Sequence, residues 1–246
     1  MLAKTVHVTL HVKEATTIID YQGTKYRSWI FGGTMPGPLV HVRLGDVVDF
    51  KLVNDAKNEF QHSIDFHAST VDVLDEFAPT GPGESKHFRF RTRYPGVFMY
   101  HCGAAPMIQH IACGMYGAVI VDPVKYTKHY PRPDREYVLV QRNYVPDPDD
   151  VDAMVNSPVA FHPIAGIWDR VYPSGNPGNV MYGVQTYNVA VAEAVTFDIV
   201  SPKGHATNNA IVDHTMRAAL HGAITVLMNK PDADPKLGKG DNIIIR

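Results

Sequence analysis

The chain has 246 residues, of which 45% are apolar and 20% are charged, and its formal net charge at pH 7 is −2. This length suffices for one large or two small globular domains. The small net charge excludes a general attraction to nucleic acid, and no apolar run approaches the roughly 18 residues of a membrane-spanning helix.

The first half of the chain predicts short β-strands separated by glycine and proline turns. Residues 5–12 alternate between polar and apolar side chains, with the period of two typical of a half-buried strand. Because this alternation begins at once, we expect no signal peptide in this chain. Further runs rich in β-branched and aromatic residues lie at 26–31, 39–43, 47–53, 87–91, 94–101 and 116–121. Many short strands at close spacing indicate an antiparallel β-sandwich.

The second half carries a weaker strand pattern. Residues 137–141 predict one more strand, and 147–154 predict a short helix with acids in its first turn. Later strand-like runs lie at 184–189, 195–200, 210–214 and 222–228. These runs loosely repeat the pattern around residues 100–121, which indicates two related β domains.

The predicted domain boundaries follow from these changes in pattern. We predict a first domain at 1–123, a linker and connecting segment at 124–158, a shortened second domain at 159–229 and a tail at 230–246. The tail is rich in lysine, aspartate and glycine.

Three candidate metal ligands lie on one segment, where Cys102, His110 and Met115 have the spacing Cys-x7-His-x4-Met. A thiolate, an imidazole and a thioether suit copper, and a loop between two strands can bring them to one point. His62 is the candidate for a second imidazole, which would complete a type 1 electron-transfer copper site. The alternative is a buried cysteine beside unrelated loop histidines. Cys113 has no comparable pattern of spaced ligand residues around it, so it is predicted to be a small packed side chain.

A second set of histidines is expected to face away from this site. His101 adjoins Cys102, and neighbouring residues of a strand point to opposite faces. His67 lies at an odd spacing from His62, so it is also expected on the far side. By analogy with catalytic zinc, a catalytic metal needs about three protein ligands and an open position. His214 is the candidate third ligand. The alternative is that His214 is a structural histidine in a strand, with its hydrogen-bonding groups already paired.

These residues resemble the copper-containing nitrite reductases, a branch of the multicopper oxidase superfamily. The likeness rests on Thr34-Met-Pro-Gly-Pro-Leu-Val with Gly45-Asp46, His62-Ser-Ile-Asp-Phe-His67, the loop from His101 to Met115, Phe161-His-Pro-Ile164 and Val212-Asp-His214. The resemblance implies an all-β fold of two cupredoxin-type Greek-key sandwiches, the second of them shortened. It implies type 1 copper on His62, Cys102, His110 and Met115, and type 2 copper on His67, His101 and His214.

The resemblance also implies an enzyme of denitrification, an oxidoreductase that reduces nitrite to nitric oxide. An electron would enter at the type 1 copper and pass through Cys102 and His101 to the type 2 copper. Asp65 and His162 would hold the bound ligand and supply protons, and Ile164 would restrict how that ligand lies. The alternatives are a type 1 copper electron carrier with a lost catalytic site, a copper-storage protein, and another multicopper oxidase activity. The sequence contains no His-x-His pair, which disfavours a laccase-type trinuclear cluster.

The family pattern further implies partners and a compartment. It implies a homotrimer in which His67 and His101 come from one chain and His162 and His214 come from the next. The electron donor would be a small cupredoxin or a cytochrome c that docks near residues 104–107. The implied location is periplasmic or otherwise extracytoplasmic, and neither nucleic acid nor membrane insertion is expected.

Overall fold

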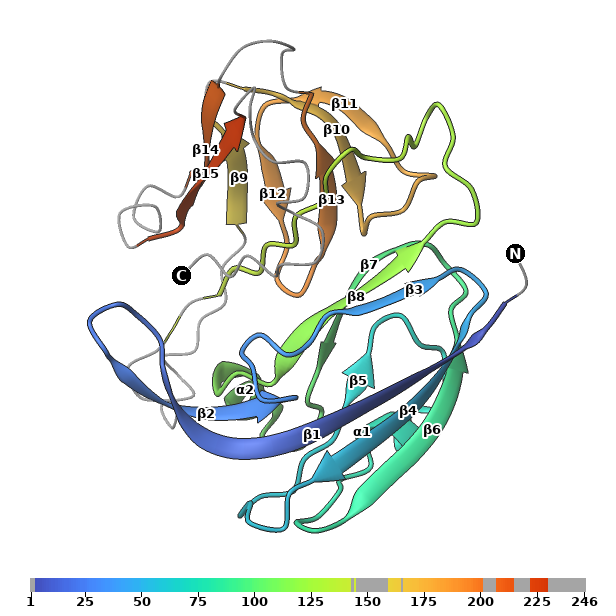
Figure 1. The fold of residues 1–246 in the computed structure, drawn as a ribbon, viewed down its shortest axis with the longest axis vertical. Coiled ribbons are helices and arrows are strands. Elements are labelled where there is room, and N and C mark those ends of the chain that lie inside the picture. The colour runs from blue at the N-terminus through green and yellow to red at the C-terminus, as the bar shows by residue number, and fades with distance from the viewer. Residues whose placement is uncertain are drawn as a thin grey trace. The chain divides into compact units, whose positions relative to one another are not determined.

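The computed structural model describes residues 3–142, 144, 159–164, 166–200, 207–214 and 222–229 (Figure 1). The described elements are strands with two short helices, so the all-β prediction is confirmed. The chain forms two compact units: unit 1 contains the described residues up to 124 together with Tyr144, and unit 2 contains those of 125–142 and from 159 onward. The predicted helix at 147–154 and the predicted tail at 230–246 lie outside the described residues.

The described part of unit 1 contains two four-stranded sheets. The first has the order β2-β1-β4-β6 and contains β1 (Thr5–Ile18), β2 (Lys25–Phe31), β4 (Val47–Asn54) and β6 (Ser85–Arg91). The second has the order β3-β8-β7-β5 and contains β3 (Val40–Arg43), β5 (Asp65–Phe66), β7 (Gly96–His101) and β8 (Tyr116–Asp122). Helices α1 (Val73–Phe77) and α2 (Met107–Ala112) lie in the connections between strands. Strand β1 pairs in parallel with β4, as β3 does with β8, so the chain crosses between sheets instead of forming only hairpins.

The core of unit 1 follows from the period-two patterns of its strands. In β1 the residues at even positions from Val6 to Val12 face inward, while those at odd positions are exposed. Strands of both sheets contribute to one cluster of buried residues. Phe50 of β4 and Phe66 of β5, for example, pack edge to face with their ring centres 4.9 Å apart. Full burial of each such side chain stabilises the fold by roughly 1.5–3 kcal/mol.

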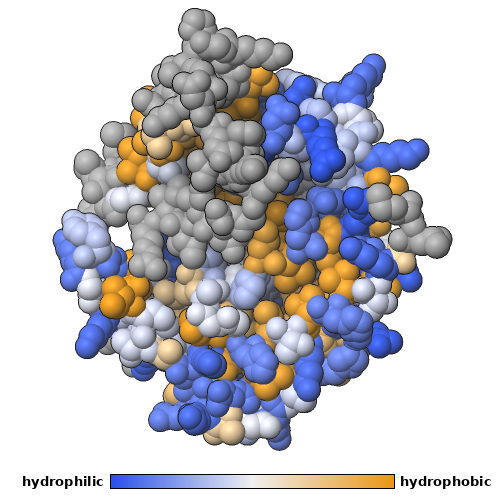
Figure 2. Space-filling model, in the orientation of Figure 1, coloured by the Kyte–Doolittle hydropathy of each residue, from blue (hydrophilic) through white to orange (hydrophobic). Residues whose placement is uncertain are grey.

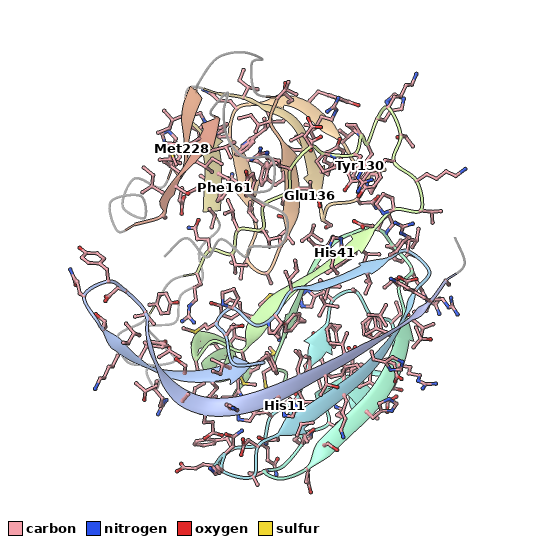
Figure 3. The ribbon with its side chains drawn as sticks, in the orientation of Figure 1. His11, His41, Tyr130, Glu136, Phe161 and Met228 are labelled. Carbon is pink, nitrogen blue, oxygen red and sulfur yellow. The ribbon has the colours of Figure 1, made fainter. Side chains whose placement is uncertain are left out.

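The described part of unit 2 also contains two sheets. A three-stranded sheet of order β11-β10-β13 contains β10 (Trp168–Pro173), β11 (Met181–Val184) and β13 (Val195–Asp198). A four-stranded sheet of order β12-β9-β14-β15 contains β9 (Val159–Pro163), β12 (Tyr187–Val189), β14 (Thr207–Asp213) and β15 (Ile224–Asn229). Phe161, labelled in Figure 3, stacks on Phe197 of the other sheet at 5.5 Å, beside the buried Trp168.

Two predictions about the second half are corrected by the structure. The predicted strand at 137–141 is wrong, because this segment is irregular and its Leu139 and Val140 are exposed. An apolar, β-branched run forms a strand only where a neighbouring strand offers it a ladder. The run predicted at 184–189 is split, since β11 ends at Val184 and β12 begins at Tyr187 in the other sheet. Within the described part of the chain, no helix is long and apolar enough to cross a membrane.

Candidate metal centres

His62, Cys102 and His110 converge in unit 1, and we call them the thiolate cluster. The Nδ1 atoms of His62 and His110 are 3.1 Å apart, and the Cys102 Sγ lies 3.3 Å from His110 Nδ1. All three side chains are buried, and their ligand atoms lie within 4.8 Å of one another. The structure therefore brings together three of the four residues expected at the first site.

Local backbone contacts hold each member of this cluster. His62 forms an isolated β-bridge with Thr80, with N–O distances of 3.0 and 2.8 Å. Cys102 follows β7 directly, and His110 lies in the last turn of α2. The fourth expected ligand, Met115, is fully buried; its carbonyl accepts from Cys102 N at 3.0 Å, and its N–H donates to His110 O at 3.1 Å.

Burial determines the protonation of the thiolate cluster. It lowers the pKa of His110 to about 4, helped by the charge of the neighbouring His62 and opposed by Glu14. Burial also lowers the pKa of His62, against the effect of Glu14. The pKa of the Cys102 thiol is raised by burial, although the backbone N–H of Ser63 donates to its Sγ at 3.4 Å. Both imidazoles are therefore neutral at pH 7 and ready to ligate a metal, whose charge would favour the thiolate.

The donor set fits copper. Two neutral imidazoles and one buried sulfur are the arrangement typical of an electron-transfer copper site, and a fully buried thioether follows five residues after the second imidazole. The indole of Trp29 packs against both imidazoles, with its ring centre 4.5 Å from that of His110 and 5.4 Å from that of His62. This aromatic wall restricts both rings and excludes water from them.

Asp65, His67 and His101 form a second group, which we call the imidazole cluster. The Nε2 atoms of His67 and His101 are 3.1 Å apart, and Asp65 Oδ2 lies 3.4 Å from the Nε2 of His101 and 3.7 Å from that of His67. His101 Nδ1 lies 2.8 Å from the carbonyl of Cys102, which can only accept, so Nδ1 carries the proton and Nε2 keeps its lone pair. The cluster thus presents two imidazole nitrogens and a carboxylate to one point, and it fits a metal with an incomplete ligand shell.

Strand pairing explains why adjacent residues serve different clusters. Asp65 pairs with His101 across β5 and β7, and His67 N donates to Met99 O at 3.0 Å. Asp65 and His67 are two residues apart and share a face, whereas Cys102 lies one residue beyond His101 and joins the thiolate cluster. Two short segments, residues 62–67 and 101–110, therefore each contribute to both clusters.

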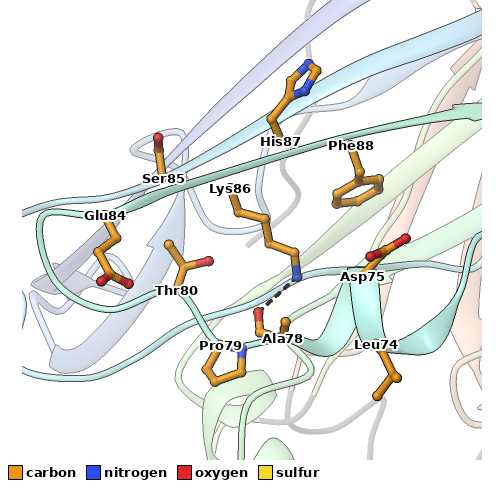
Figure 4. Close-up of a pocket in the computed structure, with 10 residues that line it drawn as sticks. All are labelled: Leu74, Asp75, Ala78, Pro79, Thr80, Glu84, Ser85, Lys86, His87 and Phe88. Atoms are coloured by element: carbon orange, nitrogen blue, oxygen red, sulfur yellow. Dashed lines mark hydrogen bonds between the residues drawn. The ribbon is translucent and has the colours of Figure 1, made fainter.

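A buried carboxyl that the sequence did not reveal lies behind Asp65. Glu76 of α1 is only 5% exposed, and its Oε1 has no hydrogen-bond partner among the described residues. Burial raises the pKa of Glu76 to about 7; the Ser69 hydroxyl opposes this increase, and Asp65 adds to it. Lys86 on β6 donates from Nζ to the backbone carbonyls of Glu76 and Ala78 at 2.6 and 2.9 Å, and it lines the shallow pocket of Figure 4.

His162 and His214 lie together in unit 2, and we call them the histidine pair. Their ring centres are 5.1 Å apart at an interplanar angle of 67°. His162 Nδ1 lies 2.8 Å from the carbonyl of Gln185, so its Nε2 is free to accept or to bind. Ile164, two residues along the chain from His162, is 45% exposed. All three residues expected from the second half of the chain therefore lie around the neighbouring strands β9 and β14.

The comparison with known proteins supports this picture. Residues 11–125 match the family model described as multicopper oxidase. Copper-containing nitrite reductases of Neisseria meningitidis serogroup A and Rhizobium sullae are 37% and 43% identical over 140 and 123 residues, which are 56% and 49% of this chain and 35% and 32% of those proteins. The matched stretch thus spans about a third of these relatives.

Solved structures extend the likeness to nearly the whole chain. The copper nitrite reductase from Nitrosomonas europaea is 44% identical with a TM-score of 0.93, over 98% of this chain and 100% of that one. The enzyme from Thermus scotoductus SA-01 is 26% identical with a TM-score of 0.82, over 95% of this chain and 63% of that one. The fold and the matching family model define a cupredoxin of the multicopper oxidase class. Within that class, the chain belongs to the copper-containing nitrite reductase family.

Proposed function

We propose that the chain is a copper enzyme that reduces nitrite to nitric oxide. The observation that supports this proposal is the direct succession of His101 and Cys102, because each of them belongs to a different one of the two candidate metal-binding clusters. In this proposal the thiolate cluster with Met115 holds type 1 copper, and the imidazole cluster contributes to type 2 copper. The covalent link between the two residues would give an electron a short path from the first site to the second.

A second copy of the chain completes the type 2 site in this proposal. The imidazole cluster offers two histidines, and a catalytic metal ordinarily takes about three protein ligands. We assign His214 of a neighbouring copy as the third, with His162 and Ile164 of that copy beside it. This requires a homo-oligomer, and the homotrimer that we expect from the sequence fits this requirement.

An exposed apolar row near the histidine pair supports that assembly. Ile224, Val226 and Met228 are 47%, 50% and 59% exposed, and they alternate along β15, an edge strand of its sheet. Apolar side chains are exposed over this part of the viewed face in Figure 2, and Met228 is labelled in Figure 3. An edge strand with an uncovered apolar row is typical of a surface that another chain covers.

The reaction adds one electron and two protons to nitrite and yields nitric oxide and water. Copper bound to the two clusters would supply the one-electron chemistry and a Lewis acid for nitrite. Asp65 would hold a proton on the carboxylate oxygen that faces His67 and His101 and deliver it to a nitrite oxygen. His162, whose Nδ1–H is held by the Gln185 carbonyl, would first take up a proton on its free Nε2 and then, as an imidazolium, give this second proton to nitrite. The exposed Ile164 would limit how nitrite lies.

The electron donor and the compartment belong to the same proposal. Met107 and Ile108 of α2 are exposed, and they flank His110 of the thiolate cluster in sequence. We assign this helix as the contact for a small cupredoxin or a cytochrome c. We also propose an extracytoplasmic location, which the resemblance to the family implies.

Copper counting with electron paramagnetic resonance tests the proposal. The copper-loaded chain should bind two ions per protomer, with separate type 1 and type 2 signals, and should form nitric oxide from nitrite. His67→Ala should abolish the type 2 signal and the activity while it keeps the type 1 signal. The control His87→Ala removes a mostly exposed imidazole of unit 1. It should leave the type 1 signal, the type 2 signal and the activity unchanged. One copper per chain and a type 1 signal alone would instead establish an electron carrier.

A further inference from the structure

The alternation of β1 carries a charged residue to the inner face of unit 1. Leu10 and Val12 face the core, and Glu14 continues their register. In the first sheet Glu14 pairs with Trp29, whose indole packs against His62 and His110. A carboxylate therefore reaches the back of the thiolate cluster from a strand that contributes no ligand to it.

The contacts of Glu14 are specific. Its Oε1 lies 3.0 Å from His62 Nε2 and accepts the backbone N–H of Phe60 at 2.9 Å. Its Oε2 accepts the backbone N–H of Glu59 at 3.1 Å, and its own N–H donates to Asn58 Oδ1 at 2.9 Å. Glu14 thus clamps the segment that precedes His62 and holds the far nitrogen of the His62 ring at the same time.

These contacts determine which nitrogen of His62 is free. A carboxylate that accepts two backbone N–H groups acts as an acceptor, so the proton of neutral His62 lies on Nε2. Nδ1 then keeps its lone pair and faces Cys102 and His110. A carboxylate behind a metal-bound imidazole also makes the ring a stronger donor. Because its negative charge lies in buried surroundings, it stabilises the more highly charged state of the ion.

We propose that Glu14 is a positioning residue that fixes the Nδ1-ligating tautomer of His62 and lowers the reduction potential of the type 1 copper. This inference rests on the proposed copper site of the thiolate cluster and adds a residue that controls it. Lowering the potential favours onward transfer of the electron to the imidazole cluster and makes uptake from a donor less favourable. Glu14 would therefore control the balance between the two steps.

The reduction potential of Glu14→Gln tests the proposal. The copper-loaded full chain is titrated with redox dyes while its visible thiolate-to-copper band is followed. The variant should keep this band. Its affinity for cuprous ion divided by its affinity for cupric ion should be at least tenfold higher than in the wild type. For one electron, a tenfold change in this ratio raises the reduction potential by about 59 mV. The control Asp55→Asn removes a carboxylate from the segment that Glu14 holds, the one that precedes His62. Asp55 accepts from Lys57 N and touches no ligand, so the potential of this variant should match that of the wild type.

The outcomes separate the two proposals. A wild type without the visible band would refute the copper site itself, whereas an intact band with equal potentials in wild type and Glu14→Gln would overturn only the role of Glu14. A second measurement covers a variant that does not fold. In the copper-free wild type, nitrogen NMR at pH 7 should show the His62 proton on Nε2, and a proton on Nδ1 would overturn the proposal.

Discussion

Replacing Glu76 with glutamine should stabilise the chain at neutral pH, although it removes a native side chain. The Glu76 carboxyl is buried against Asp65 and Ser69, and burial raises its pKa from the ordinary 4.5 to about 7. In the unfolded chain this carboxyl ionises near its ordinary value. The unfolded state therefore gains ionisation free energy as the pH rises from 4.5 to 7, and the folded state does not. Each pKa unit corresponds to about 1.4 kcal/mol, so roughly 3 kcal/mol of stability should be lost over this range.

Glutamine has nearly the same shape and stays neutral, so the variant should escape this loss. Its free energy of unfolding should exceed that of the wild type by an amount that grows between pH 4.5 and 7 and is constant above pH 7. Urea unfolding of both copper-free proteins at several pH values measures the difference between their free energies of unfolding. Titrating groups that the two proteins share contribute equally to both and cancel from this difference. Asp75→Asn, an exposed position of the same helix, should show no such trend. A difference that is independent of pH, or that favours the wild type at pH 7, would refute the reasoning.

Three further changes test other parts of the structure. Cys102→Ser should abolish the intense visible band of the copper-loaded protein, because the sulfur is its origin; a variant that keeps the band would show that copper binds elsewhere. Tyr100→Phe should lower the free energy of unfolding by about 1 kcal/mol, because the hydroxyl donates to Pro38 O at 2.7 Å; equal urea midpoints would contradict this. Val226→Glu should dissociate the assembly in sedimentation, whereas Thr9→Glu on the exposed face of β1 should not.

Short-range patterns in the sequence predicted much of the candidate site. Two features could be predicted because they depend on short sequence separations: the spacing of Cys102, His110 and Met115, and the adjacency of His101 and Cys102. A single loop fixes the first in space, and a single strand fixes the second. Helix α2 was not apparent because six residues leave almost no periodicity to detect. The strand expected at 137–141 shows the converse error, since a strand needs a partner that the local sequence does not specify.

Residues that support the ligands were harder to find. Glu14 lies 48 positions before His62, and Glu76 lies 11 positions after Asp65, so neither belongs to a motif. One sequence pattern does point to Glu14, because it is an acid at an inward position of an otherwise apolar alternation. A charge at such a position requires a buried partner, and the histidines were the available candidates.

Cys102 and Cys113 bracket α2, both are buried, and they form no disulfide with each other. A thiol reagent can reach them only when this segment opens, so the rate of modification in the copper-free chain measures how often the segment opens. Cys113 lies outside the thiolate cluster and reports the movement of the helix alone. The ratio of the Cys102 and Cys113 modification rates would show whether the segment that carries His110 opens as a unit or frays from one end. Bound copper should slow both rates, because it would hold His110 and Cys102 together.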